Sequence, residues 1–256
     1  MNKFELVINH AQEIPIEKIA EYKSGLEKIK NNIPIQYITN HQEFMKMDFY
    51  VDESVLIPQP DTEILVEEVI KYAQEISENS TSGDSRPSLK ILDLCTGSGA
   101  IAISLAKYID NAEITATDIS SKAIQVAKLN AEKNLVHKKI SFIESDMFEK
   151  ISQTDFNIIV SNPPYIETDV INTLSMEVQH EPKIALDGGA DGLYFYKKII
   201  EHSSNHLTKN GTIFLEIGYN QKQALFDLIN HSDNFCMPTC VKDFGGNDRV
   251  IICRRK

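Results

Sequence analysis

Residues 89–100 read LKILDLCTGSGA, and this stretch decides the fold. An apolar, strand-like run ends at Asp93-Leu94, and a helical pattern begins at Ala100. Between them, Gly97 and Gly99 allow a tight turn and a close approach of the backbone to a ligand. A helix that starts here also presents free N–H groups and the positive end of its dipole. In a doubly wound sheet, nucleotide-like cofactors bind at such a turn.

The sequence on the C-terminal side of this turn alternates between strand-like and helical patterns. The expected strands are Leu89–Leu94, Glu113–Thr117, Ile140–Glu144, Phe156–Ser161, Thr212–Ile217, Thr239–Lys242 and Arg249–Cys253. The expected helices are Ala100–Tyr108, Ser121–Asn134, Met147–Ile151, Gly192–Leu207 and Gln221–Asn230. Alternating units of this kind predict an α/β fold, with a parallel sheet and helices on both faces. Seven strands that end in a hairpin-like pair fit a Rossmann-like methyltransferase dependent on S-adenosylmethionine (SAM) better than a dehydrogenase.

The sequence on the N-terminal side divides into two short pieces before the main domain. Residues 1–33 predict a short helical segment that Pro15 interrupts, and residues 34–57 predict a β-hairpin linker. The domain then covers residues 58–256 and opens with a helix over residues 61–76, capped by Asp61 or Thr62. Residues 77–88 are polar and of low complexity, so we expect a loop that forms a tolerated insertion.

Composition limits the classes of function. The chain has 256 residues, 42% hydrophobic and 25% charged, with four cysteines and a formal net charge of −11. It shows neither a signal peptide nor an apolar run of membrane-spanning length, so we expect a cytoplasmic protein with free thiols. Cys236 and Cys240 lack partners for a metal site, and no metal is expected. The acidity argues against long duplex DNA as a substrate.

Acidic residues at the ends of the neighbouring strands accompany the glycine turn. The second strand ends at Asp118, 19 residues after Gly99, where a carboxylate can accept hydrogen bonds from both hydroxyls of a ribose. This spacing does not separate NAD from SAM. Asp93 is expected either to orient the Thr96-Gly97-Ser98-Gly99 loop or to face the amino-acid part of the cofactor. After the third strand, Asp146 is expected to be an adenine contact or a helix cap, and Met147 to pack on the ring.

The fourth strand runs into Asn162-Pro163-Pro164-Tyr165, which carries the proposed chemistry. An amide or aromatic amino nitrogen is a poor nucleophile because its lone pair is delocalised. The Asn162 side-chain oxygen and the Pro163 carbonyl can hold its two N–H groups and favour a tetrahedral nitrogen that points at the methyl donor. Proline fixes the backbone, and Tyr165 can pack against the planar group. No histidine is expected to act as a base, and the turn alone fits an amide and a base equally well.

Longer segments resemble the HemK/PrmC family of release factor methyltransferases. They are residues 34–38 (PIQYI), 56–63 (LIPQPDTE), 180–182 (HEP), 185–193 (ALDGGADGL) and 243–249 (DFGGNDR). The resemblance runs from about residue 34 to the end of the chain. It implies methyl transfer from SAM, with S-adenosylhomocysteine as product, to the glutamine nitrogen of the Gly-Gly-Gln motif in peptide chain release factors. It also implies that the Thr96–Gly99 loop, Asp118, Met147 and Asn162 contact the cofactor, and that Asn162–Tyr165 receives the glutamine.

The sequence departs from the family pattern in three places. Gln59 stands where the family usually has arginine, Cys95 replaces the commoner glycine, and the N-terminal helical region is much shorter. The family's longer region helps to dock the release factor, so partner choice is open. We expect a monomer that binds neither nucleic acid nor membrane.

Two alternatives stay open at this point. An adenine amino-methyltransferase would use the same turn, but it would need a flipped base and a cationic surface. A SAM-binding protein without catalytic activity would not need Asn162 beside an intact cofactor loop.

Overall fold

The computed structural model describes residues 15–79 and 88–256. The expected first half of the N-terminal helical segment and most of the expected insertion therefore lie outside the described residues. No helix within the described ranges is both long enough and apolar enough to cross a bilayer.

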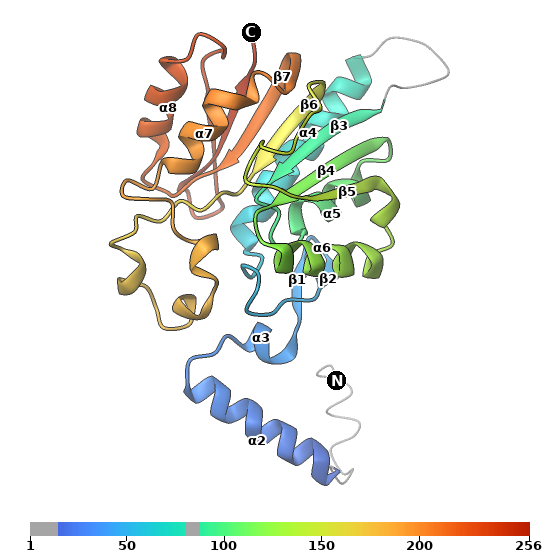
Figure 1. The fold of residues 1–256 in the computed structure, drawn as a ribbon, viewed down its shortest axis with the longest axis vertical. Coiled ribbons are helices and arrows are strands. Elements are labelled where there is room, and N and C mark those ends of the chain that lie inside the picture. Colours follow the sequence, from blue (N-terminus) through green and yellow to red (C-terminus); the bar gives the residue numbers. More distant parts are fainter. Residues whose placement is uncertain (1–14, 80–87) are drawn as a thin grey trace.

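A seven-stranded sheet forms the centre of the protein (Figure 1). Its strands, in spatial order, are β5 (Ile140–Glu144), β4 (Ala112–Asp118), β3 (Leu89–Leu94), β6 (Phe156–Ser161), β7 (Leu207–Glu216), β9 (Asp248–Arg254) and β8 (Thr239–Lys242). The first five run parallel, and β9 is antiparallel to both β7 and β8. The predicted doubly wound sheet and its final antiparallel pair are confirmed.

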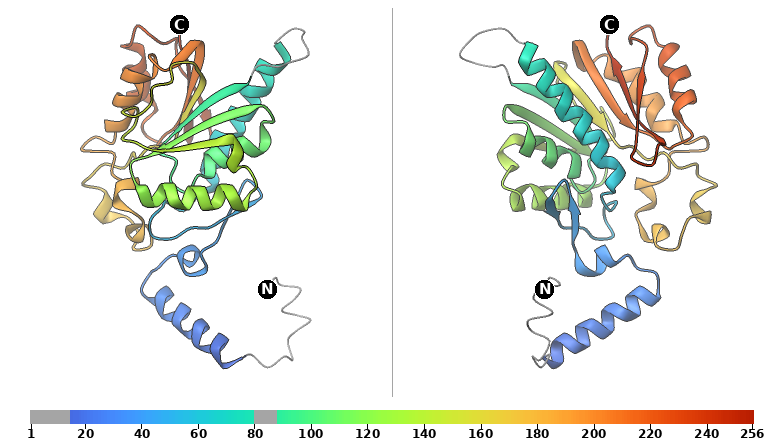
Figure 2. Two further views of the ribbon diagram at one scale, coloured as in Figure 1. Left: turned by 45° about the vertical axis from the view of Figure 1, so that its right-hand side comes forward. Right: turned by 180° about the vertical axis from the view of Figure 1, so that it is seen from behind.

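Helices cover both faces of the sheet (Figure 2). They are α4 (Pro60–Asn79), α5 (Ala100–Tyr108), α6 (Ser121–Lys133), α7 (Tyr194–Ser203) and α8 (Lys222–Asn230). Successive strand residues point to opposite faces, so Ile158 and Val160 pack with α4 and α5, whereas Ile159 packs with α7 and α8. Because both faces of the central strands β3 and β6 are buried, these two strands are mainly apolar.

The N-terminal part projects away from the sheet as α2 (Ile16–Lys30), followed by α3 (Ile35–Thr39) (Figure 1). A hairpin then forms from β1 (Gln42–Phe44) and β2 (Met47–Phe49). The extended structure expected from Ile35 onward is wrong for residues 35–39, which form a helical turn after Pro34. The Tyr37 side chain is buried there, and its hydroxyl donates to the Val55 carbonyl at 2.6 Å. Tertiary packing thus overrides the β-branched pattern.

Asn130 on α6 fastens this N-terminal part to the sheet domain. Its side chain is fully buried and bridges two segments that are far apart in sequence. The amide oxygen accepts from the Tyr50 N–H at 2.7 Å, while the amide nitrogen donates to the carbonyls of Tyr50 and Ser98, both at 2.9 Å. One side chain therefore connects the end of the hairpin to the glycine turn after β3.

Three local predictions differ from the structure, and one segment for which no element was predicted forms 3₁₀ turns. Residues 147–150 form turns and not a helix. Strand β7 starts at Leu207, where a helix was expected to end, and 3₁₀ turns occupy much of residues 171–185. Helix α4 starts at Pro60, which suits a first helical position because its missing N–H is not needed there. Neither Asp61 nor Thr62 is therefore required as the cap, and both side chains are used elsewhere.

The topology brings two turns together. The chain leaves β3 towards β4 on one side and leaves β6 towards β7 on the other, so the strand order reverses between β3 and β6. Leu94 pairs with Ser161 in the parallel register, and both strands end there. The glycine turn and the Asn162 turn therefore start side by side, at the point where open α/β sheets bind ligands.

Glu181 joins the segment before α4 to the 171–185 region. Its side chain is 8% exposed, and one carboxyl oxygen accepts from the Ile57 N–H at 2.9 Å. Burial raises the pKa of Glu181 to about 7, although that hydrogen bond opposes the shift. The folded protein thus keeps a proton on Glu181 at pH values where the unfolded chain has lost it.

This burial predicts a pH-dependent effect of Glu181→Gln. As the pH rises from about 4.5 to 7, ionisation favours the unfolded chain, so the wild type loses stability that a glutamine retains. We expect the variant to be more stable at pH 8, by on the order of 2 kcal/mol in urea unfolding, and the gain to vanish near pH 4.5.

Glu167→Gln is the matched control, because Glu167 is an exposed glutamate on a nearby part of the chain. It should change the free energy of unfolding by less than about 0.5 kcal/mol at either pH. A Glu181→Gln effect of equal size at pH 5 and pH 8 would contradict the assignment.

Candidate active site

Two adjoining cavities open at the carboxyl ends of the strands, with volumes of about 290 and 330 Å³. Leu56, Asn162 and Ala185 line both of them. The Asn162 turn therefore forms part of the wall between the two spaces.

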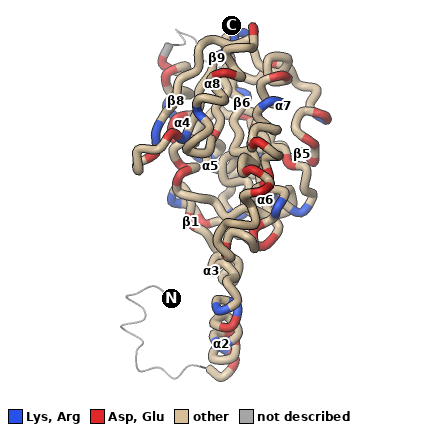
Figure 3. The backbone as a smooth tube through the Cα atoms, turned by 90° about the vertical axis from the view of Figure 1, so that its left-hand side faces the viewer, with Lys and Arg blue, Asp and Glu red and all other residues tan. Residues whose placement is uncertain are grey.

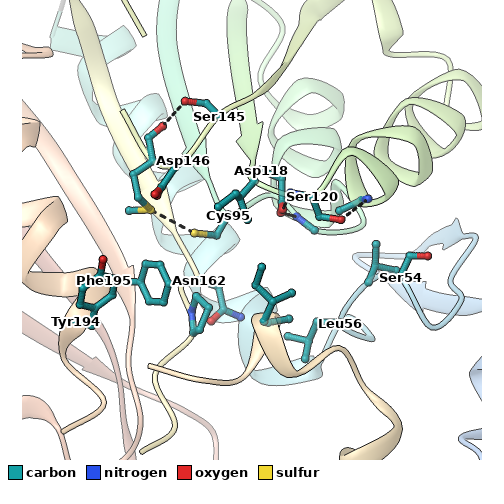
Figure 4. A pocket seen from close by; sticks show the side chains of 18 residues that line it. Ser54, Leu56, Cys95, Asp118, Ser120, Ser145, Asp146, Asn162, Tyr194 and Phe195 are labelled. Carbon is teal, nitrogen blue, oxygen red and sulfur yellow. Dashed lines mark hydrogen bonds between the residues drawn. The ribbon is translucent and has the colours of Figure 1, made fainter. Parts of the chain in front are cut away.

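The first cavity lies over the glycine turn (Figure 4). Strand ends contribute Cys95, Gly97, Asp118, Asp146 and Met147, and the Asn162 turn closes one side. The figure shows Ser54 and Leu56 approaching from the segment before α4, and Tyr194 and Phe195 from the start of α7. The remaining lining residues are Val55, Ile119, Ser120, Ala123, Ser145, Pro164, Ile184 and Ala185.

Asp93 lies behind this cavity and not in its wall. Its side chain is fully buried, and one oxygen accepts from the Thr96 hydroxyl at 2.6 Å. Burial raises the pKa of Asp93 to about 7, and the Thr96 bond opposes the shift. Of the two roles expected for Asp93, the structure matches the one that orients the loop. Thr96, Ser98 and Gly99 likewise shape the turn without lining the cavity.

Three positions in the turn, Cys95, Gly97 and Gly99, have positive φ angles that favour glycine. Gly99 has a φ of +82°, and a Cβ there would lie 2.9 Å from the Ile103 side chain and 3.1 Å from that of Ala127. Glycine therefore lets α5 pack against α6. Cys95 has a φ of +60°, a region that favours glycine, which explains the glycine found here in the family pattern. The Cys95 thiol lies 3.7 Å from the Met147 sulfur.

Asp118 closes the turn from the end of β4. One carboxyl oxygen accepts from the Gly97 N–H at 2.8 Å, and the other accepts from the Ser120 N–H at 2.9 Å. Burial raises the pKa of Asp118, while these backbone donors act in the opposite direction. Asp118 also lines the first cavity, so its carboxylate can accept from a further donor there.

Asp146 and Met147 stand at the end of β5, on the same cavity wall. Met147 is buried and offers an apolar surface. Asp146 is half-buried, and the Lys198 ammonium lies 3.5 Å from its carboxyl group. Since no helix follows, Asp146 is not a helix cap.

Asn162 has a partner that the sequence did not suggest. Its side-chain nitrogen donates to the Thr62 hydroxyl, 3.2 Å away in the first turn of α4. The amide oxygen is then the atom left to accept from a ligand.

The second cavity lies on the other side of the Asn162 turn. Pro163 and Tyr165 line it, so the four residues of the turn divide between the two spaces: Pro164 faces the first, and Asn162 faces both. Its other lining residues are Leu56, Gln59, Pro60, Asp61, Ile166, Val178, Glu181, Ala185, Leu186, Glu216 and Arg249.

The segment over residues 185–193 holds this turn from outside. A Cβ at Gly188 would lie 2.7 Å from the Tyr165 Cα, and one at Gly192 would lie 2.5 Å from the Tyr165 carbonyl oxygen. Gln221 donates to that same carbonyl at 2.9 Å. The two glycines thus let the chain pack directly on the backbone after Pro164, which gives this motif a physical role.

The segment over residues 243–249 supplies the guanidinium of the second cavity. Arg249 pairs with Asp61 and Asp243, each at 3.0 Å, and donates to the Ile217 carbonyl. Gln59 makes no ionic contact; it donates to the Ile57 carbonyl at 3.1 Å. Gln59 and Arg249 both line the second cavity. Arg249 therefore supplies a cation to the same wall in which the family pattern has an arginine at the position of Gln59.

Sequence reasoning missed several of these residues. No site role was predicted for Glu181, Glu216, Arg249, Tyr194 or Phe195, and Thr62 was expected only as a helix cap. Their roles depend on contacts between segments far apart in the chain. The signal available was the density of family-like motifs around them.

His180 is exposed, as expected, and its ring lies 3.0 Å from the Asn31 carbonyl. Within the described ranges, no three metal-ligating side chains form a group.

The first cavity has the chemistry of a nucleoside site. Its acidic groups, Asp118 and Asp146, suit hydroxyl and amino donors, while Met147, Ile119 and Phe195 offer an apolar surface for a ring. The residues present therefore fit SAM, whose sulfonium and ammonium groups are cationic.

Comparisons with known proteins agree with this geometry. Residues 82–189 match the family model of the methyltransferase small domain. A release factor glutamine methyltransferase from Clostridium acetobutylicum is 39% identical over 253 residues, which cover 98% of this chain and 85% of that protein. One from Lactococcus lactis is 43% identical over 243 residues, covering 92% and 84% of the two chains.

A solved structure resembles the fold at lower sequence identity. The crystal structure of a methyltransferase from Pyrococcus furiosus has a TM-score of 0.59 at 18% identity, covering 90% of this chain and 97% of that one. It supports the fold alone. The near full-length sequence matches go further: the chain belongs to the release factor glutamine methyltransferase family.

Proposed function

We propose that this protein transfers a methyl group from SAM to the side-chain nitrogen of the glutamine in the Gly-Gly-Gln motif of peptide chain release factors. S-adenosylhomocysteine is the second product. One observation carries the proposal: Asn162 lies in the wall between two cavities, one fitted to a nucleoside and one open to a substrate side chain.

The two cavities would bind different ligands, the cofactor in the first and the substrate side chain in the second. Gly97, Asp118 and Met147 in the first would hold the cofactor, with Asp118 accepting from the ribose hydroxyls and Met147 packing on the adenine. Asp146, partly neutralised by Lys198, is the acceptor for the adenine amino group. When bound, SAM supplies an electrophilic methyl group on a sulfonium.

The substrate glutamine would enter the second cavity. Its NH₂ group offers two donors, and the Asn162 side-chain oxygen and the Pro163 carbonyl are two acceptors on one turn. Holding both N–H groups limits delocalisation of the nitrogen lone pair and directs it towards the first cavity. The nitrogen becomes acidic only after it has been methylated, so no strong base is required before transfer.

The turn must be rigid to position the nitrogen. Two prolines fix its backbone, and Gly188, Gly192 and Gln221 hold the backbone of Tyr165 from outside. This packing supports a role of the turn in orienting the substrate nitrogen. Orientation of the reacting atoms can lower the barrier to such a transfer substantially.

The charge of the protein favours a protein substrate over a nucleic acid. Lysines and arginines are spread over several elements and interspersed with acidic residues (Figure 3), and the net charge is −11. We therefore propose that the enzyme acts on release factors and not on DNA or RNA. We also propose that it is cytoplasmic and acts as a monomer.

Mass spectrometry of a purified release factor tests the proposal. After incubation with this protein and SAM, we expect one added methyl group, located by fragmentation on the Gly-Gly-Gln glutamine. A release factor with that glutamine changed to alanine is the control and should stay unmodified. Methyl transfer to adenine in DNA or RNA, with none to the release factor, would contradict the proposal.

Two substitutions should separate cofactor binding from transfer. Asp118→Ala removes the carboxylate that would accept from ribose, so we expect SAM affinity to fall about tenfold or more by calorimetry. Asn162→Ala should leave SAM affinity within about threefold but slow turnover about 100-fold or more. Unchanged turnover in Asn162→Ala, or unchanged affinity in Asp118→Ala, would refute the corresponding role.

A further inference from the structure

The direction of the Asn162 amide decides whether the turn can work. The oxygen and nitrogen ends of this group have nearly the same shape, but only the oxygen can accept from a substrate NH₂ group. If the amide were flipped, the NH₂ group of Asn162 would face the NH₂ group of the substrate, and two donors cannot form a hydrogen bond with each other. Some feature of the protein must therefore hold the nitrogen end away from the substrate.

Thr62 is in the right place to do this. It lies in the first turn of α4, 5% exposed, and its hydroxyl oxygen accepts from the Asn162 side-chain nitrogen at 3.2 Å. A hydroxyl also has one proton to donate, and with that proton it could bind a flipped Asn162 oxygen instead. The hydroxyl alone would therefore not fix the direction of the amide.

Glu216 can remove this ambiguity. It is the last residue of β7 and is 2% exposed, its carboxyl group lies near the hydroxyls of Thr62 and Tyr165, and its buried Oε2 atom makes no hydrogen bond among the described residues. An ionised Glu216 can only accept, so the Thr62 proton points to the carboxylate and the lone pairs of the Thr62 oxygen are left for Asn162. The Asn162 nitrogen is then the only end of the amide that can bind Thr62.

The charges around Glu216 belong to the same cluster. Arg249 lies close enough to attract its carboxylate, and Arg249 is itself held by Asp61 and Asp243. Tyr165 faces Glu216 from the turn and is partly buried. Residues from α4, β7, β9 and the Asn162 turn therefore meet in the wall of the second cavity.

We propose that Thr62, with Glu216 behind it, is a positioning residue that fixes the Asn162 side chain with its oxygen towards the substrate nitrogen. This role rests on the proposed glutamine methylation. Thr62 acts through Asn162 and touches neither cofactor nor reacting atoms, since it lines neither cavity.

Thr62→Val tests this role because valine keeps the shape of threonine and removes the hydroxyl. At saturating SAM, we expect single-turnover methylation of the release factor to slow about 10- to 100-fold, the usual effect of losing a buried hydrogen bond. The dissociation constant of SAM and the KM for the release factor should change by less than about threefold. Thr62→Ser restores the hydroxyl and should recover most of the rate.

Thr212→Val is the matched control for loss of a buried threonine hydroxyl. Thr212 is 2% exposed, its hydroxyl donates to the Tyr72 hydroxyl at 2.6 Å, and it lines neither cavity. It should lower the melting temperature about as much as Thr62→Val while leaving the rate of methylation unchanged.

A double-mutant cycle distinguishes positioning from a general structural effect. If Thr62 acts only through Asn162, Thr62→Val should not slow transfer further in an Asn162→Ala protein. Additive losses, or a full rate in Thr62→Val alone, would overturn the positioning role while the wild type still methylates glutamine. A wild type that leaves the release factor unmodified would overturn the proposed function itself, and the positioning role with it.

Discussion

The parallel register of β3 with β6 is the constraint on which the site depends. Pairing of Leu94 with Ser161 ends both strands at one level, and the Ser161 hydroxyl reinforces the pair by donating to the Leu94 carbonyl at 2.8 Å. The glycine turn and the Asn162 turn follow directly. Because the strand order reverses at this pair, the chain leaves the two turns in opposite directions and the space above them remains open for ligands. Cofactor loop and reactive turn are therefore neighbours by topology.

Around this pair, separate segments supply rigidity from three sides. Asp118 ties the glycine turn to β4, and Asn130 connects the same turn to the hairpin end. On the far side, Gly188 and Gly192 allow close packing on the backbone of Tyr165. Several of these contacts use backbone groups, which leaves side chains free for ligands. Asn162 lies where the first and second cavities meet.

Much of the fold could be predicted from the sequence, because its determinants are local. The apolar runs that became β3 and β6 are buried on both faces, and the glycine turn follows β3 directly. Asp118 and Asn162 were found because each comes immediately after a strand. Helix α3 was missed because Tyr37 is held by a contact with Val55, which no periodicity reveals. Thr62 was expected only as a helix cap, and its contact with Asn162 was missed for the same reason: the two residues are 100 positions apart.

A crystal structure of the protein with S-adenosylhomocysteine and a peptide containing Gly-Gly-Gln is the most direct test of the proposed function. We predict the glutamine side chain in the second cavity and the nucleoside in the first. The glutamine nitrogen should lie within about 2.7–3.2 Å of both the Asn162 side-chain oxygen and the Pro163 carbonyl oxygen. A glutamine bound outside the second cavity, or one whose nitrogen contacts neither acceptor, would contradict the account.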